Sequence, residues 1–140
     1  MTREELAREK ARLPRGWGRF GKSIDELGEL AEDGEELVST CVGLNPSFEH
    51  RSITLGGALN ELTKATNLVL ALTDRRLLLV AAGFGGGAHS NSSIALEGLE
   101  VVASSKRELT VRWPDGEMKV KGIAKQMLPG FLEALQARLA

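Results

Sequence analysis

The sequence predicts an α+β domain: an antiparallel β-barrel or sandwich of about seven short strands, capped by a C-terminal α-helix. Short apolar segments separated by turn sequences run from residue 35 to residue 121, which is typical of barrels and sandwiches. Residues 126–140 instead carry leucines and a phenylalanine at helical spacing. A chain of 140 residues has the usual length of one domain.

Residues 1–34 are predicted to be a helical, charged N-terminal extension. Residues 2–12 have the composition of a short, solvated helix. It should end before Pro14–Gly21 (PRGWGRFG), a segment rich in helix breakers that we expect to be a linker. A second helix is expected to begin at Ser23, with Glu26 as its capping-box partner.

From Glu35 the apolar pattern takes the two-residue period of a β-strand, so the domain proper is assigned to residues 35–140. The first strand is expected to end at Asn45-Pro46. The following twenty residues fit no single element. A short strand over His50–Leu55 and a helical turn over Ala58–Ala65 are both compatible with them.

The next strands are the clearest in the chain. Leu68–Leu72 and Leu77–Ala82 are apolar strands on either side of Thr73-Asp74-Arg75. This turn should be tight, because the short Asp74 side chain can bond the backbone ahead of it. After the glycine-rich loop Gly83–Gly87, further strands are expected near residues 93–96 and 99–103.

The last strands form a predicted hairpin. Leu109, Val111 and Trp113 alternate with polar residues, as in a strand with one wet face. The turn Pro114-Asp115-Gly116 follows, with its glycine where a positive φ is needed.

The C-terminal helix should begin between Gln126 and Pro129, because proline is tolerated only in the first turn. Its apolar face must pack on the sheet. The side chains expected in the core are Leu70, Leu77, Val111, Trp113 and Phe131.

Two segments resemble the bacterial pleckstrin-homology-like (GRAM-like) domains. In that family a strand ends in a T-D-R-R-L-L turn, which residues 73–78 match. The next strand leads to a serine-isoleucine-x-leucine segment and an apolar pair, matched within Ser93–Val102. An Asp-Gly hairpin and a terminal helix complete the likeness, which covers residues 35–140. Residues 46–66 and the basic N-terminus depart from the pattern.

The resemblance implies a PH-like, non-catalytic binding module and therefore no enzyme. It does not imply phosphoinositide binding, because residues 35–50 are acidic where a basic cluster would cradle the phosphates.

No cofactor or metal is expected. His50, His89 and Cys41 lie at no zinc-ligand spacing, and the glycine patterns at Gly16–Gly21 and Gly83–Ala88 lack the strand–helix context of a nucleotide site. The net charge of −1 indicates no nucleic-acid partner. A single cysteine and a charged N-terminus predict a soluble, cytoplasmic protein.

Charge is distributed unevenly along the chain. Residues 1–22 hold seven basic and three acidic side chains, or +4, whereas residues 23–49 hold eight acidic and no basic ones. Basic residues interleaved with aromatics can contact an anionic membrane or an acidic partner. The alternative is that the acidic run Asp25–Glu36 neutralises them within the molecule. The candidate contact residues are Arg12, Arg15, Trp17, Arg19, Phe20 and Lys22.

The function expected from the sequence is protein–protein interaction or self-assembly. A partly open barrel offers edge strands and a groove beside its helix, and either can take up a peptide strand. The alternative is a peripheral binder of anionic membranes that uses the basic N-terminal segment.

Overall fold

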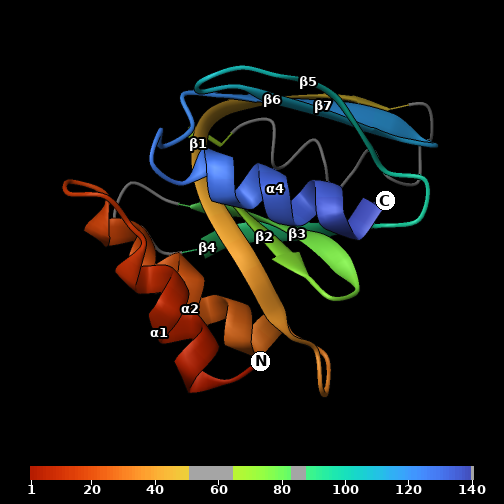
Figure 1. The fold of residues 1–140 in the computed structure, drawn as a ribbon. Coiled ribbons are helices and arrows are strands. Elements are labelled where there is room, and N and C mark those ends of the chain that lie inside the picture. The colour runs from red at the N-terminus through yellow and green to blue at the C-terminus, as the bar shows by residue number, and fades with distance from the viewer. Residues whose placement is uncertain (51–64, 83–87, 140) are drawn as a thin grey trace.

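The structure is a computed structural model that describes residues 1–50, 65–82 and 88–139. It confirms the α+β class, with a seven-stranded antiparallel sheet, a C-terminal helix and short N-terminal helices (Figure 1). The elements in chain order are α1 (Arg3–Ala11), the 3-10 helix η1 (Gly18–Phe20), α2 (Gly21–Leu30), β1 (Leu37–His50), β2 (Asn67–Thr73), β3 (Arg76–Ala82), β4 (Ala88–Ala95), β5 (Glu100–Ser104), β6 (Leu109–Trp113), β7 (Gly116–Lys121) and α4 (Leu128–Leu139).

The sheet has the strand order β4-β3-β2-β1-β7-β6-β5, and the long strand β1 joins its two halves. The first part of β1 pairs with β2 and the second part with β7. The prediction that this strand ends at Asn45-Pro46 is wrong. The register shifts between Leu44 and Ser47, and Asn45 takes a φ of 49°, but pairing resumes at Ser47 opposite Lys119. An irregularity of this kind bends a strand without ending it.

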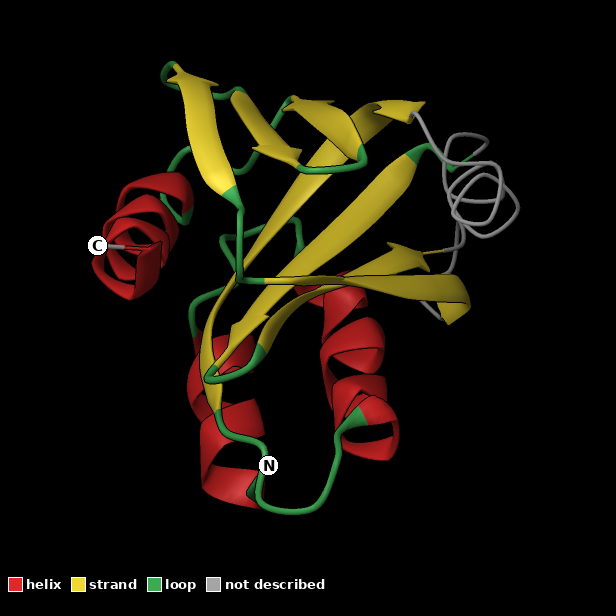
Figure 2. Ribbon diagram, turned by 90° about the vertical axis from the view of Figure 1, so that its right-hand side faces the viewer, coloured by secondary structure: helices red, strands yellow, loops and turns green. Residues whose placement is uncertain are grey.

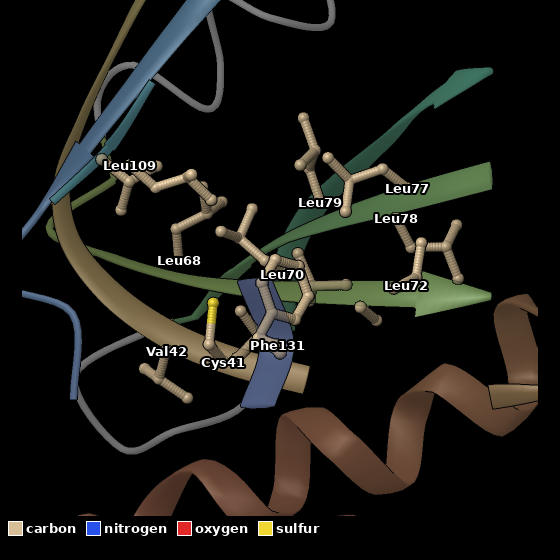
Figure 3. Packing of buried hydrophobic residues seen from close by; sticks show 14 of the residues in the cluster. Cys41, Val42, Leu68, Leu70, Leu72, Leu77, Leu78, Leu79, Leu109 and Phe131 are labelled. Atoms are coloured by element: carbon tan, nitrogen blue, oxygen red, sulfur yellow. The ribbon is translucent and has the colours of Figure 1, made fainter. Parts of the chain in front are cut away.

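The inner face of the bent sheet holds the core on which α4 packs. Phe131 of α4 lies beside Cys41 and Leu70, while Val42 points to the other side of β1 (Figure 3). All five residues expected in the core are buried, the most exposed being Trp113 at 6%. Helix α4 begins at Leu128, with Pro129 in its first turn as predicted.

The outer face of β2 and β3 is covered as well. Every residue of β2 is buried, and all of β3 except Arg76. Helices α1 and α2 lie against this half of the sheet (Figure 2), and α2 contacts β2 and β4. Phe20, Ile24 and Leu27 belong to the same buried cluster as the strands. The first 34 residues and the sheet therefore share one hydrophobic core.

The first N-terminal helix lies where it was predicted, but the second begins earlier than expected. Helix α2 begins at Gly21, and Ser23 is a buried residue inside it, so the predicted capping box at Ser23 and Glu26 is wrong. A capping box exists instead on α1. The Thr2 backbone N–H donates to Glu5, and the Glu5 N–H donates to the Thr2 hydroxyl. Two backbone donors at that helix end are thus satisfied.

Two turns form for reasons other than those predicted. In the β2–β3 turn, the Thr73 hydroxyl accepts hydrogen bonds from the N–H groups of Arg75 and Arg76, in place of Asp74. Gly116 has no positive φ; it is the first residue of β7, paired with Trp113. The β6–β7 turn is therefore Pro114-Asp115 alone. The two elements considered for residues 50–55 and 58–65 lie largely outside the described residues.

Candidate functional site

Helix α1 lies along the edge of β1 that β7 leaves unpaired. Its charged side chains hydrogen-bond to backbone groups of that edge. Glu5 accepts from the Leu37 N–H at 3.1 Å, and Arg8 donates to the Leu37 carbonyl at 2.7 Å. The Glu9 carboxylate accepts from the Thr40 N–H at 2.8 Å. The prediction that this helix is solvated is therefore wrong for the side that faces β1.

The same edge is closed further along by Arg12 and by the loop before α4. Arg12 forms an ion pair with Glu9 and donates to the Met127 carbonyl at 3.3 Å. The Ala124 N–H donates to the Val42 carbonyl at 2.9 Å. The groove expected between the sheet and the C-terminal helix is thus occupied at these positions by the protein's own side chains and backbone.

The T-D-R-R turn joins the two layers of the fold. Arg76 donates two hydrogen bonds to the buried carboxylate of Glu35, at 2.9 and 3.0 Å, and one to the Leu30 carbonyl. The Thr73 hydroxyl donates to the same carboxylate at 2.7 Å. A bidentate, charge-assisted pair of this kind fixes the orientation of its two side chains and also stabilises the folded protein.

The middle residues of that turn have the same role. Asp74 accepts from the Glu36 N–H at 2.9 Å, and Arg75 donates to the Asp33 carbonyl at 2.9 Å. All four residues of the motif therefore attach the β2–β3 turn to the loop that follows α2. The motif on which the resemblance rests has a structural role here.

The hydrogen bonds from Arg76 lower the pKa of Glu35 from 4.5 to about 2. The unfolded chain binds this proton at a higher pH than the folded chain does. The stabilisation is therefore complete above about pH 4.5 and is lost as the pH falls toward 2. A shift of this size corresponds to about 3 kcal/mol.

Urea unfolding between about pH 5 and about pH 2 tests this expectation. The unfolding free energy of the natural protein should fall by about 3 kcal/mol more than that of Glu35→Gln. Glu32→Gln is the control, because Glu32 is 60% exposed and lies 3.9 Å from Arg76. Parallel pH curves for the natural protein and Glu35→Gln would contradict the pairing.

The six basic and aromatic candidates do not form one surface. Phe20 is completely buried, and Arg12 is engaged with Glu9. Arg15, Arg19 and Lys22 are exposed, and Trp17 is half-buried. Trp17 packs on Phe20 with ring centroids 5.8 Å apart, and the Arg19 guanidinium lies 4.4 Å from the centre of the Phe20 ring. The surface left for a partner consists of Arg15, Trp17, Arg19 and Lys22, called the basic loop below.

The acidic run Asp25–Glu36 pairs with α1 and with the sheet. Lys10 pairs with Asp25 at 2.8 Å, which joins α1 to α2. Glu32 and Glu35 instead face Arg76 of the sheet. Asp25–Glu36 is therefore occupied mainly in joining elements, and the salt bridges of the described residues include none between it and the basic loop.

A groove lies between β4, the loop that follows it and the β6–β7 turn. Within the described residues, β4 pairs with β3 alone and β5 with β6 alone, so the barrel has an open seam. The groove at this seam has a volume of about 270 Å³. Its lining comes from β4, the loop after it and the β6–β7 turn: Ser92, Ser93, Ile94, Ala95, Glu97, Trp113, Pro114 and Asp115. We call it the seam groove.

The described residues contain no group of three His, Cys, Asp or Glu side chains placed to hold a metal ion. Burial raises the pKa of the Cys41 thiol, which keeps it protonated and unreactive. None of the described helices is long and apolar enough to cross a membrane.

Sequence reasoning missed the seam groove. Its residues come from two segments, 92–97 and 113–115, that only the strand order brings together. Trp113 was expected in the core, and this prediction is correct. Nothing in the sequence indicated that Trp113 also lines a groove. Gly98 is one local sign: its φ is +78°, and a Cβ there would lie 2.9 Å from Pro114.

Comparison with known proteins supports the fold alone. No protein-family model matches the sequence, and no curated protein matches it. Among solved structures, the Vps36 N-terminal PH domain is similar, with a TM-score of 0.50 and 14% sequence identity. The match covers 78% of this chain and 82% of that one. The chain therefore has a pleckstrin-homology-like fold.

Proposed function

We propose that this protein is a protein-interaction module that takes up an extended peptide segment along the free edge of β4. The observation that carries the proposal is the open seam, where the edge of β4, which no other described strand pairs with, lies beside a groove. An added strand gains backbone hydrogen bonds from the edge and specificity from pockets for alternate side chains. At the seam groove, the strand edge that supplies the backbone hydrogen bonds lies next to the groove that receives side chains.

The two edges of the sheet differ in how well they are protected. Strand β5 has five residues, and its register shifts between Val101 and Ala103, which blunts an edge. Strand β4 has eight residues without Lys, Arg, Asp, Glu or Pro, and its pairing with β3 is regular from Ser90 to Ala95. Natural proteins usually protect such an edge with charges or proline, so an unprotected one favours a partner.

A second function, binding to anionic membranes, is favoured by one observation: Arg15, Arg19 and Lys22, close together in the sequence before and at the start of α2, are all exposed. Each basic residue near a charged surface contributes about 1 kcal/mol. Phe20 is buried, so Trp17 is the aromatic side chain left to insert. The basic loop alone would anchor the protein only marginally, and we therefore favour the peptide edge.

The same proposal includes two broader assignments. The T-D-R-R-L-L turn at residues 73–78 supports a place among the bacterial pleckstrin-homology-like domains. A single buried cysteine suits a reducing cytoplasm, where we expect the protein to act.

Selection from a random peptide library displayed on phage tests the proposal. We expect binders that, as synthetic peptides, shift the backbone amide resonances of Ser90–Ala95 and the indole N–H of Trp113. The protein has two tryptophans, and Trp17 in the basic loop should not respond. A peptide with N-methyl groups on alternate residues cannot donate those backbone hydrogen bonds and should bind at least about tenfold more weakly.

The same labelled protein distinguishes the other occupants. Vesicles of phosphatidylserine, with phosphatidylcholine vesicles as the control, should leave both indole signals unchanged. A selective shift of Trp17 would support the membrane instead. Broadening of the β4 amides with protein concentration, without peptide, would assign the edge to a second copy. Binders that leave β4 and Trp113 unchanged would refute the edge site.

A further inference from the structure

Two carboxylates line the seam groove without an ion-pair partner. Glu97 lies in the loop after β4, and Asp115 in the β6–β7 turn, and both are exposed. Within the described part of the chain, neither has a basic group within 4.0 Å. The nearby cation of β6, Arg112, is already held by Glu100 and Glu117. Among the described residues, the groove therefore presents two negative charges with no cation paired to them.

The remainder of the groove lining is largely apolar. Ile94, Trp113 and Pro114 supply aliphatic and aromatic surface, and Ile94 and Trp113 are each 6% exposed. An apolar lining with carboxylates beside it complements a lysine or arginine side chain. The aliphatic stem of such a side chain packs on apolar surface while its charged end reaches the carboxylates.

We propose that the seam groove selects an extended peptide segment by one basic side chain, whose charged end pairs with Glu97 and Asp115. This inference rests on the proposed function, since it specifies what the β4 edge takes up. The partner is a protein segment with lysine or arginine at one position and uncharged residues two positions away on either side.

The register follows from the exposure of β4. Ile94 is buried and Ser92 half-buried, whereas Asn91, Ser93 and Ala95 are exposed. Ser92 and Ile94 therefore share the inner face of the sheet, whereas Ser93 and Ala95 lie on its outer face, and residues of both faces line the groove. Side chains opposite each other on neighbouring strands share a face. Because Glu97 and Asp115 are exposed, the basic side chain is one that the peptide presents on the outer face, beside Ser93 or Ala95.

Charge-neutral variants test the inference in the full chain. Glu97→Gln with Asp115→Asn removes both carboxylates with little change of shape. Glu29→Gln with Asp33→Asn changes the net charge equally at exposed positions on and after α2. The peptide library is selected on the natural protein and on each double variant.

We expect lysine or arginine to be enriched at one position on the natural protein and on the Glu29/Asp33 control, and the enrichment to vanish on the Glu97/Asp115 variant. A synthetic peptide with arginine at that position should bind the latter variant about tenfold more weakly, as two partly exposed ion pairs are lost. Replacing the arginine by glutamine should have the same effect, and the two losses should not add.

The outcomes separate this inference from the function on which it rests. Peptides that shift the β4 amides without any basic preference, or that bind both double variants equally, would overturn the charge selection and leave the strand edge as the site. Binders that shift neither β4 nor the Trp113 indole would overturn both. A basic preference that survives on the Glu97/Asp115 variant would place the cation elsewhere and refute the inference.

Discussion

Replacing Glu9 by alanine is expected to destabilise the domain by about 3 kcal/mol, because a buried backbone N–H and a partly buried guanidinium lose their acceptor. The Glu9 side chain is 2% exposed and interacts with four groups: the guanidinium groups of Arg8 and Arg12, and the N–H and hydroxyl of Thr40. Its loss leaves the Thr40 N–H buried without its acceptor and Arg12 without its counter-ion.

Urea unfolding of purified variants measures the effect. Glu4→Ala is the matched control, since Glu4 is an exposed glutamate of the same helix and its loss changes the net charge equally. The control should lie within about 0.5 kcal/mol of the natural protein. Equal stability of the two variants would mean that α1 does not complete the edge of β1, and the account of that edge would fail.

The strands and the C-terminal helix could be predicted because their patterns are local. Leu109, Val111 and Trp113 alternate, and the structure has them buried on one face of β6. Phe131 and Leu135 recur at helical spacing and are buried in α4. A chain with apolar side chains at these spacings has few ways to bury all of them, so the predicted and the observed elements agree.

The sequence contains one indication that helices cover the outer face of the sheet, and it becomes clear only once the structure is known. The apolar residues of β2 and β3 do not alternate, and a continuous apolar strand is buried on both faces. Something must therefore cover the outer face, and α2, which contacts β2 and β4, lies against this half of the sheet (Figure 2). The apolar stripe of Ile24 and Leu27 predicted a buried helix face but not the strands on which it packs, because local periodicity gives no information on long-range contacts.

The edge contacts of α1 could not be predicted from the sequence. Glu5, Arg8 and Glu9 have the composition of a solvated helix, yet each bonds to β1, about thirty residues away. The seam groove is hidden in the same way, since Glu97 and Asp115 meet only through the strand order. Contacts that depend on the pairing register of the strands cannot be predicted from any single segment of the sequence.

Phe131→Ala and Phe20→Ala should each cost about 3–5 kcal/mol, as large-to-small changes at buried aromatic sites. The two side chains are completely buried and come from different layers: Phe131 from α4 on the inner face, and Phe20 from the start of α2. If Phe20 instead inserts into a membrane, its removal should weaken lipid binding and leave stability nearly unchanged.

Thermal and urea unfolding of both variants distinguish these possibilities. Val102→Ala is the control, because Val102 is 42% exposed on the edge strand β5 and should change stability by less than about 0.5 kcal/mol. Similar large losses at Phe20 and Phe131 would show that the helical layer is as much a part of the cooperative unit as the barrel. A cost below about 1 kcal/mol at Phe131 would mean that α4 does not close the barrel, and a cost that small at Phe20 would detach the N-terminal helices from the core.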